Sequence, residues 1–453
     1  MRPNILAVDV GTTALKLGVF SPELEKLCEA TRRYDVNVYG GGRADIEPDK
    51  WWCALGQCCR EVEPHLRSVG VLALSVTTPG LTPMAEDGSA VGPAILFFDG
   101  RSHWQARAIR QLVDEEKFLR ETCNLPVSGG SSLCSMMWIR ENQPEVWEAT
   151  ARFGHTNTHI VKRLTGRWVI DPSTISITGM YNTAKDDLTW NQDVLEAAGI
   201  PDRMLPELME SYAPAGVIRP EMAGVLGLPR DTVVLCGGND AVLSAFSGGI
   251  TEPGQINDVC GTCEITSVCV NQPIASRNFN IRRHAIPGRW LTFFILNTGG
   301  KALEWFHANL CRDMTEDHFY EEYIPGILRR FFDSPNPDAV EAEWPEYGPF
   351  LGGSRYTLER LKASFSGVCL ETTREDLLPS LIRGNALYVG RHLKEVASLV
   401  NVGRKVAVSG GGATIRSFMD VKKRWTGNYD YEYHDQCSLT GAAMLGQLYL
   451  NAD

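Results

Sequence analysis

A carboxylate and a Gly-Thr-Thr turn stand close together near the start of the chain. The stretch ILAVDVGTTALKLGVF places Asp9 two positions before Gly11, with Thr12 and Thr13 next. Glycine lets an anion approach the backbone, and threonine hydroxyls add hydrogen-bond donors. Because a carboxylate repels a bound phosphate, a cation must separate them, and Mg²⁺ is the usual one. The pattern predicts a phosphate cradle with Asp9 as magnesium ligand and Lys16 as added positive charge; the alternative is an ordinary hairpin with a polar tip.

The second half of the chain repeats this pattern in part. In NDVCGTCEITSVCV, Gly261 and Thr262 follow Gly11 and Thr12 at an offset of 250 residues. β-Branched and apolar residues flank both Gly-Thr pairs, which predicts two hairpins. Val259 stands where the first hairpin has Asp9, so the two are not equivalent and only the first offers a metal ligand.

Another carboxylate begins a predicted helix after a short apolar strand. In TVVLCGGNDAVLSAFSGG, Asn239 and Asp240 follow two glycines and precede a helix of small residues. One interpretation makes Asp240 an N-cap. The other makes it a general base, since a helix N-terminus favours an ionised carboxylate that could accept a hydroxyl proton.

Glycine runs mark two further strand-to-helix connections. VSGGGATIRSF carries Gly410, Gly411 and Gly412, and NTGGKALEWF carries Gly300 followed by Lys301. Such runs permit close approach of the backbone to a nucleotide. A glycine-rich connection without a ligand is the alternative.

Two smaller patterns carry weaker signals. Asp99 and Arg101 in ILFFDGRS follow a predicted strand and could bind a polyhydroxylated ligand or form an exposed ion pair. Cys260 and Cys263 form a lone CxxC with no second pair at zinc-finger spacing, which favours a structural interpretation over a metal site.

The elements that must position these residues are readable from periodicity. Short apolar runs predict strands at 71–76, 232–238 and 405–412, and helical spacing predicts helices at 48–69 and 374–400, with a proline in the first turn of the latter. The two hairpins predict two related α/β domains. A Gly- and Pro-rich run from 247 to 255 sets the boundary, giving domains 1–247 and 248–453.

Composition limits the partners of the chain. The 453 residues carry 44 basic and 55 acidic side chains, a net charge of −11, which argues against general binding of nucleic acids or anionic membranes. No apolar run approaches the roughly 18 residues of a membrane span. The N-terminus shows no secretory pattern. Thirteen cysteines, an odd number, fit reduced thiols and a cytoplasmic location.

In chain order, these stretches resemble the FGGY family of carbohydrate kinases, within the actin/hexokinase/Hsp70-like ATPase superfamily, and its xylulose kinase-like members in particular. The resemblance extends along nearly the whole chain and is carried by AVDVGTTALKLGVF, ADIEPDKWW, SSLCSMMWIRENQPE, CGGNDAV, CGTCEIT, NTGGKALEWF, SGGGAT and LTGAAMLG. Each match is short, but their order is specific.

The resemblance implies a fold and a set of roles. It implies an α/β fold of two RNase H-like domains facing a central cleft, and ATP-dependent phosphorylation of a small sugar or polyol, a ketopentose first. Asp240 matches the catalytic aspartate, and Asp9 matches the carboxylate that holds Mg²⁺. The ATP-side positions are Gly11, Thr12, Thr13, Lys16, Gly261, Thr262, Gly300, Gly410, Gly411 and Gly412. The sugar-side positions are Thr77, Thr78, Asp99, Asn239 and Asp240.

The chain departs from the family pattern in three segments. Thr77 to Gly80 replace a Gln-Met-His-Gly-like run of xylulose kinases, Phe97 stands where many members have Trp, and the residues after Gly412 match poorly. A sugar- or nucleotide-binding regulatory protein without catalysis is therefore the alternative, although retention of Asp9 and Asp240 argues against it. The acceptor, the phosphorylated hydroxyl and the oligomeric state stay open, with a homodimer among the alternatives.

Overall fold

The structure is a computed structural model that describes residues 2–452, except for the side chains of Thr414 and Arg416. The chain forms two compact units. Unit 1 consists of the residues up to Thr251, Asn271–Leu291 and the residues from Gln436 on, and unit 2 consists of Glu252–Val270 and Thr292–Asp435. The expected domains are continuous, whereas both units are assembled from separated segments.

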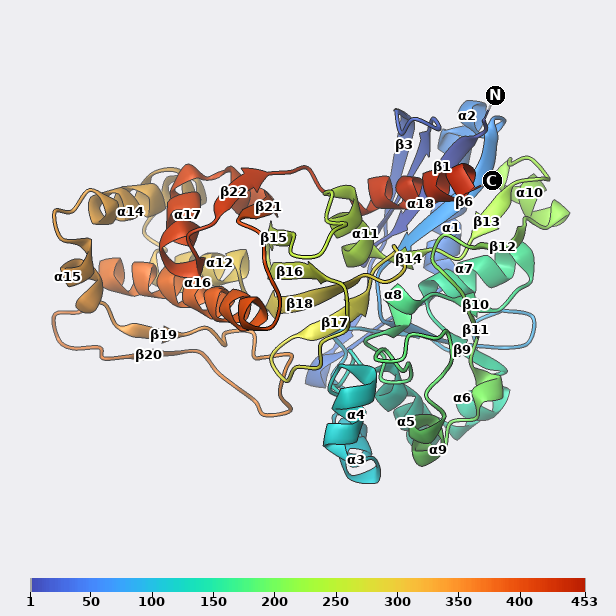
Figure 1. The fold of residues 1–453 in the computed structure, drawn as a ribbon, viewed down its shortest axis with the longest axis horizontal. Coiled ribbons are helices and arrows are strands. Elements are labelled where there is room, and N and C mark those ends of the chain that lie inside the picture. The colour runs from blue at the N-terminus through green and yellow to red at the C-terminus, as the bar shows by residue number, and fades with distance from the viewer. Residues whose placement is uncertain (1, 453) are drawn as a thin grey trace. The chain divides into compact units, whose positions relative to one another are not determined.

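Unit 1 is built on a mixed sheet with the strand order β12-β13-β6-β1-β2-β3, and β14 also pairs with β6 (Figure 1). β1 runs antiparallel to β2 and parallel to β6, which is itself parallel to β13 and β14. The strands are β1 Asn4–Val10, β2 Ala14–Phe20, β3 Lys26–Arg33, β6 Val69–Val76, β12 Pro214–Val217, β13 Val233–Leu235 and β14 Gly238–Asn239.

The remaining elements of unit 1 are helices and short strands outside this sheet, among them a separate sheet with the order β4-β5-β8-β7-β9. The strands are β4 Asn37–Tyr39, β5 Arg43–Ile46, β7 Gly80–Met84, β8 Ala94–Leu96, β9 Arg152–Gly154, β10 Val169–Ile170, β11 Glu207–Leu208 and β17 Asn280–Arg283. The helices are α1 Asp49–Glu61, α2 Glu63–Leu66, α3 His103–Leu112, α4 Glu115–Thr122, α5 Ser132–Asn142, α6 Pro144–Ala149, α7 Thr156–Thr165, α8 Pro172–Ile175, α9 Gln192–Ala198, α10 Pro220–Leu226, α11 Asp240–Ser247 and α18 Ser438–Ala452.

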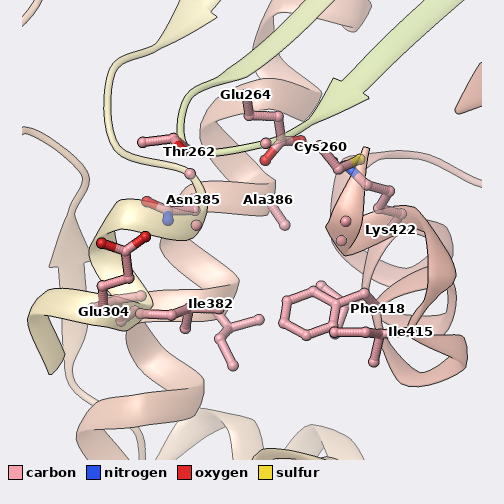
Figure 2. A pocket seen from close by; sticks show the side chains of 18 of the residues that line it. Cys260, Thr262, Glu264, Glu304, Ile382, Asn385, Ala386, Ile415, Phe418 and Lys422 are labelled. Carbon is pink, nitrogen blue, oxygen red and sulfur yellow. Dashed lines mark hydrogen bonds and ion pairs between the residues drawn. The ribbon is translucent and has the colours of Figure 1, made fainter. Parts of the chain in front are cut away.

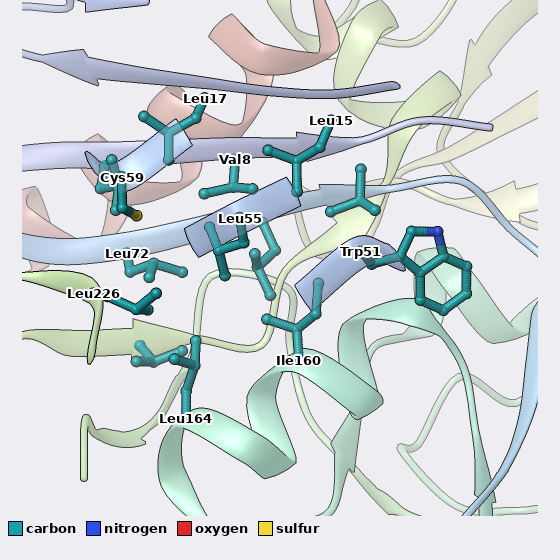
Figure 3. Packing of buried hydrophobic residues seen from close by; sticks show 14 of the residues in the cluster. Val8, Leu15, Leu17, Trp51, Leu55, Cys59, Leu72, Ile160, Leu164 and Leu226 are labelled. Atoms are coloured by element: carbon teal, nitrogen blue, oxygen red, sulfur yellow. The ribbon is translucent and has the colours of Figure 1, made fainter. Parts of the chain in front are cut away.

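One face of this sheet carries the main apolar core. Side chains alternate between the two faces of a strand, so Val8 of β1 and Leu15 of β2 point to the same side. There they pack with Trp51 and Leu55 of α1 and with Ile160 of α7 (Figure 3). The expected helix over 48–69 is divided into α1 and α2, because a proline at the start of α2 cannot donate a helical hydrogen bond.

The opposite face of β1 carries Asp9. The helix α18 lies against this face, where a Cβ atom on Gly446 would come within 2.5 Å of Ile5 Cγ2. Asp9 is four residues beyond Ile5, and its neighbours in the sheet are Lys16 on β2 and Ser75 on β6. The alternation of the strand therefore directs one carboxylate away from the core, toward the side covered by α18.

Unit 2 contains a second sheet, in which strands follow the order β18-β16-β15-β21-β22. Its strands are β15 Ile256–Cys260, β16 Glu264–Val270, β18 Trp290–Leu296, β21 Lys405–Ser409 and β22 Asp430–Tyr433, with β19 Glu346–Gly348 and β20 Ser364–Ser366 paired separately. Its helices are α12 Gly300–Leu310, α13 Glu316–His318, η3 Phe319–Tyr323, α14 Ile324–Phe332, α15 Pro337–Ala342, α16 Arg374–Leu399, η4 Gly411–Thr414, α17 Arg416–Val421 and η5 Lys422–Thr426.

The long helix of unit 2 begins earlier than its proline suggests. A capping box between Thr373 and Asp376 sets the start of α16. Pro379 therefore lies inside the helix rather than in its first turn, which corrects the expectation. The expected helix 374–400 and both hairpins are otherwise confirmed, as are the strands at β6 and β21. Among the described helices, none is long and apolar enough to cross a bilayer.

Candidate active site

The carboxyl ends of the parallel strands of unit 1 bring the predicted catalytic residues together. Asp9 lies next to last in β1, Ser75 next to last in β6, and Asp240 directly after β14. Since β14 pairs with β6 and β6 pairs with β1, the three side chains converge at one edge of the sheet. This edge is where ligands bind in open α/β sheets.

Asp9 is a buried carboxylate with few compensating contacts. Its Oδ1 accepts a hydrogen bond from Ser75 Oγ at 2.7 Å. Burial raises the pKa of Asp9 above its ordinary value, and hydrogen bonds from Ser75 and Ser438 and the charge of Lys16 only partly oppose that shift. A carboxylate whose charge is undercompensated in this way fits a bound cation such as Mg²⁺.

The turn after Asp9 presents unused backbone donors. Its carbonyl groups are anchored, because Tyr34 donates through Oη to Gly11 O at 2.7 Å and through its backbone amide to Thr13 O at 3.0 Å. Among the hydrogen bonds of the described residues, none is donated by the backbone amides of Thr12, Thr13 or Thr262. Both hairpin turns therefore offer amides to an anion.

Asp240 occupies the first turn of α11 and is not its cap. Asn239 caps the helix, since its Oδ1 accepts from Val242 N at 3.0 Å. Asp240 Oδ1 accepts from Ala241 N at 2.7 Å and from Asn239 Nδ2 at 3.1 Å. The N-cap interpretation of Asp240 is therefore wrong, and its carboxylate is held at the helix start by two donors.

The protonation of Asp240 also differs from expectation. The pKa of Asp240 is raised to about 7, first by burial and then by the negative charge of Asp9. The positive charge of Arg282 and the hydrogen bond from Ala241 oppose the shift without cancelling it. The helix N-terminus alone predicted an ionised group, whereas burial beside a second carboxylate places its titration near neutral pH, where a general base works best.

The predicted sugar-side threonines lie beside Asp240. Thr77 and Thr78 directly follow β6 and are buried. Thr78 Oγ1 accepts from Asn239 Nδ2 at 2.5 Å and from Arg282 Nη1 at 3.2 Å, and Thr77 Oγ1 lies 3.3 Å from Thr12 Oγ1. These contacts link the first hairpin, the Thr-Thr segment and the start of α11 in one network.

Asp99 is engaged within the protein. Its Oδ2 accepts from Ala44 N at 2.5 Å, and its Oδ1 accepts from the backbone amide of Arg101 at 2.8 Å. The guanidinium of Arg101 also pairs with Asp99 at 2.8 Å and with Asp45 at 2.7 Å. The ion pair expected as one alternative is present, but it is buried rather than exposed. A contact of Asp99 with a sugar stays a prediction.

The second hairpin borders a cavity of about 480 Å³ within unit 2. Its lining includes the turns and glycines predicted for the nucleotide together with apolar side chains of three helices. The main lining residues are Gly261, Thr262, Gly300, Leu303, Ile382, Asn385, Gly411, Gly412, Ile415, Phe418 and Lys422.

The two ends of this cavity differ in character. At one end the glycines and Thr262 expose backbone, and at the other the Phe418 ring faces Ile382 across the cavity (Figure 2). Asn385 Oδ1 is buried on the wall and has no partner among the described groups. An apolar slot with an unused acceptor fits a purine base that carries an amino group, and exposed backbone amides fit its phosphates.

The glycines after β21 do not share one role. Gly411 and Gly412 line the cavity, and a Cβ atom on Gly411 would meet no atom within 4 Å. Gly410 has φ +85°, and a Cβ atom there would lie 2.6 Å from Cys260 O. Close packing on β15 thus requires glycine at 410, and a contact of that residue with a nucleotide stays a prediction.

Sequence reasoning missed a charged cluster on the second hairpin, formed by Asp258, Glu264 and Lys422. Lys422 Nζ donates to Asp258 Oδ2 and to Glu264 Oε1, both at 2.6 Å. The ligand atoms of Asp258, Cys260 and Glu264 lie within 4.8 Å of one another, close enough for a metal, but the ammonium group already bridges the two carboxylates. No spacing in the sequence links Lys422 to a hairpin more than 150 residues earlier. Ser75 was also missed, although a lone serine in an apolar strand was a usable signal.

Comparisons with known proteins identify the relatives of this chain. The sequence model of the FGGY family of carbohydrate kinases, N-terminal domain, matches residues 4–247. The chain is 23% identical to a xylulose kinase of Staphylococcus xylosus over 92% of this chain and 85% of the relative. It is 23% identical to a gluconokinase of Bacillus licheniformis over 85% of this chain and 75% of the relative.

Solved structures share the fold. The xylulose kinase from Rhodospirillum rubrum superposes with a TM-score of 0.88 at 22% identity, covering 98% of this chain and 89% of that one. The gluconate kinase from Lactobacillus acidophilus superposes with a TM-score of 0.87 at 18% identity, covering 99% and 90%. The expected α/β architecture of actin-like ATPases is confirmed.

Proposed function

The chain belongs to the FGGY family of carbohydrate kinases and is a phosphotransferase with an alcohol group as acceptor; we propose that it transfers the terminal phosphoryl group of ATP to a ketopentose. The observation that carries the proposal is Asp240, a carboxylate with pKa near 7 at the same sheet edge as Asp9 and two threonines.

Asp240 would act as the general base. One carboxylate oxygen is held by Ala241 N, which orients the group for the acceptor hydroxyl. The hydroxyl proton passes to Asp240 as the hydroxyl oxygen bonds to the γ-phosphorus. The bond between that phosphorus and the bridging oxygen breaks, and ADP leaves with the electron pair. A base contributes about 10²–10⁴-fold to such steps.

The chain's own groups would divide the remaining tasks. Asp9 would hold Mg²⁺, which when bound neutralises charge on the transferred phosphoryl group. The amides of Thr12 and Thr13 would donate to that group, with Gly11 allowing its approach and Lys16 adding positive charge. In unit 2, the amide of Thr262 and the exposed backbone of Gly261, Gly300, Gly411 and Gly412 would bind the nucleotide phosphates.

A ketopentose is supported by the relatives rather than by a matched pocket. Several of the similar proteins are xylulose kinases, whereas others are gluconokinases. Thr77 and Thr78 would contact the acceptor through short hydroxyl groups, together with Asn239 and Asp99. We further place the enzyme in the cytoplasm, with a homodimer as an open alternative.

A panel of acceptors tests the proposal. ADP release would be measured by a coupled assay with ketopentoses, hexuloses, polyols and aldonates. We expect release that depends on one acceptor, with a ketopentose the best. Turnover with an aldonate alone would overturn the choice of acceptor. ATP binding without turnover on any acceptor would overturn the kinase itself and favour a regulatory binding protein.

A substitution tests the base. Asp240→Asn should lower turnover by about 10³-fold while ATP binding stays close to wild type and the variant remains folded. The matched control is Asp231→Asn, an exposed aspartate in the loop before β13, which should leave turnover unchanged. Near-normal activity of Asp240→Asn would show that the base is elsewhere.

A further inference from the structure

A buried ammonium group lies beside the phosphate end of the cavity in unit 2. Lys422 is the first residue of η5 and lines this cavity together with Glu264 (Figure 2). Its side chain is 6% exposed, and those of Asp258 and Glu264 are 1% and 13% exposed. A buried charge of this kind is stable only when it is paired.

The donors of this lysine are committed within the protein. An ammonium group has three N–H donors. Two are directed to Asp258 and Glu264 at 2.6 Å each, and a contact with the Cys260 thiol accounts for another. Lys422 is therefore arranged to neutralise the protein's own carboxylates and not to bind a phosphate directly.

The position of the carboxylates makes this neutralisation matter for a nucleotide. Cys260 and Glu264 are paired in register and enclose the turn at Gly261 and Thr262. With Lys422 present, the two carboxylates leave one net negative charge beside the turn. Without it they would leave two, next to a cavity wall that also carries Gly261 and Thr262.

We infer that Lys422 is a positioning residue for nucleotide binding, which keeps the negative charge beside the Gly261–Thr262 turn low enough for a phosphate to bind. The inference rests on the proposed function, because it takes unit 2 as the nucleotide site. It assigns to the poorly matching segment after Gly412 a role that the glycines alone do not have. The ligand class is a nucleoside di- or triphosphate.

The structure also predicts how pH changes the effect of removing Lys422 on nucleotide binding. The titratable groups that interact with Glu264 are Asp258 and Cys260 of β15 and Lys422 of η5. The charge of Glu264 also acts on Tyr431 of β22. Burial raises the pKa of Glu264, and Lys422 is the group that lowers it. Without the lysine, Glu264 will take up a proton at higher pH, so the loss of nucleotide affinity should shrink as pH falls.

The test compares ADP with adenosine by calorimetry on the full chain. Lys422→Met should weaken ADP binding at pH 8 by about tenfold or more, as expected for one added charge near a polyanion. It should leave adenosine binding within about threefold, since adenosine has no phosphate. As the pH is lowered toward 6, the ADP affinity of Lys422→Met should approach that of wild type. Equal loss of both ligands would show a merely structural role and overturn the inference.

Two further variants keep the test decisive if Lys422→Met folds poorly. Lys422→Met/Glu264→Gln restores the net charge of wild type and should regain most of the ADP affinity. Glu264→Gln alone removes a negative charge and should bind ADP at least as tightly as wild type. Weaker ADP binding in Glu264→Gln would overturn the inference.

The two proposals fail in different ways. If wild-type protein does not bind ADP or adenosine, the nucleotide site in unit 2 is wrong, whatever Lys422 does. If wild type binds ADP and Lys422→Met binds it equally well at pH 8, only the role of Lys422 is wrong.

Discussion

The two hairpins share a Gly-Thr turn but place their acidic groups on opposite faces. Asp9 is two residues before its glycine, whereas Asp258 is three residues before Gly261. Since alternate residues of a strand face opposite sides, this one-residue difference reverses the side on which the carboxylate lies. Val8 is the residue of the first hairpin that corresponds to Asp258, and it packs into the apolar core of unit 1.

The difference shows two ways to combine acidic groups with a phosphate-binding turn. In the first hairpin the carboxylate accepts hydrogen bonds from serine hydroxyls and has a raised pKa despite the charge of Lys16, so it can take an external cation. In the second, Lys422 supplies an internal cation, and the carboxylates are closed to others. The turn also differs, because Val10 pairs with Leu15 but Cys260 pairs with Glu264, which leaves one residue fewer in the second loop.

The largest expected effect comes from the same substitution in both hairpins. Asp9→Asn should lower turnover by about 10³-fold, because a neutral amide keeps the acceptor for Ser75 but loses the charge that holds a cation. Asp258→Asn should keep turnover within about threefold, since Lys422 retains Glu264 as its partner. Steady-state ADP release with the best acceptor measures both. Similar losses in the two variants would mean that the hairpins do not differ in this way.

A second effect concerns the proton on Asp240. Because its pKa is about 7, kcat/KM should fall as pH drops below 7, by about 50-fold between pH 7 and pH 5. The affinity of wild type for ADP should change far less over this range, since the charge of Lys422 opposes protonation of Glu264. A flat pH profile of kcat/KM down to pH 5 would contradict the assignment of Asp240 as base.

The same shift affects stability. Folding raises the pKa of Asp240 above its ordinary value of 3.8, so its proton stabilises the folded state at low pH and this contribution is lost as pH rises through 7. Asp240→Asn should therefore be more stable than wild type at pH 8, by on the order of 2 kcal/mol, and similar at pH 4. Urea unfolding at the two pH values measures this difference, which should be absent in Asp231→Asn.

A third effect tests the backbone of the second turn. A Cβ atom on Gly261 would lie 3.4 Å from Cys263 O, an ordinary contact, so Gly261→Ala should fold normally. It should still weaken ADP binding by about tenfold, because the added methyl group stands where a phosphate approaches the amides. Gly326→Ala in α14, where a Cβ atom would meet nothing within 4 Å, is the control. Unchanged ADP affinity in Gly261→Ala would remove this turn from the phosphate site.

Local patterns in the sequence predicted the helices and strands well, but they predicted few of the contacts between distant segments. The hairpins, β6 and α16 follow from alternation, helical spacing and capping, which act over a few residues. The interpretation of Asp240 as the cap of α11 was one residue late, because Asn239 and Asp240 are both good caps and the choice depends on the buried network with Thr78. The Lys422 cluster joins segments that are distant along the chain, so only tertiary structure reveals it.

The smallest effect distinguishes the hydroxyl groups that support each carboxylate. Ser75 Oγ donates to Asp9 at 2.7 Å, whereas Thr266 Oγ1 lies 3.4 Å from Asp258 Oδ1 and is the weaker donor. Ser75→Ala should lower the free energy of unfolding at pH 7 by about 1–2 kcal/mol, because a buried carboxylate loses its short hydrogen bond. Thr266→Val should cost less than about 0.5 kcal/mol, since Lys422 already satisfies Asp258. Equal costs in urea unfolding would mean that other groups compensate Asp9 as fully as Lys422 compensates Asp258. The contrast between Asp9, which can take a cation, and Asp258, which is already paired, would then not hold.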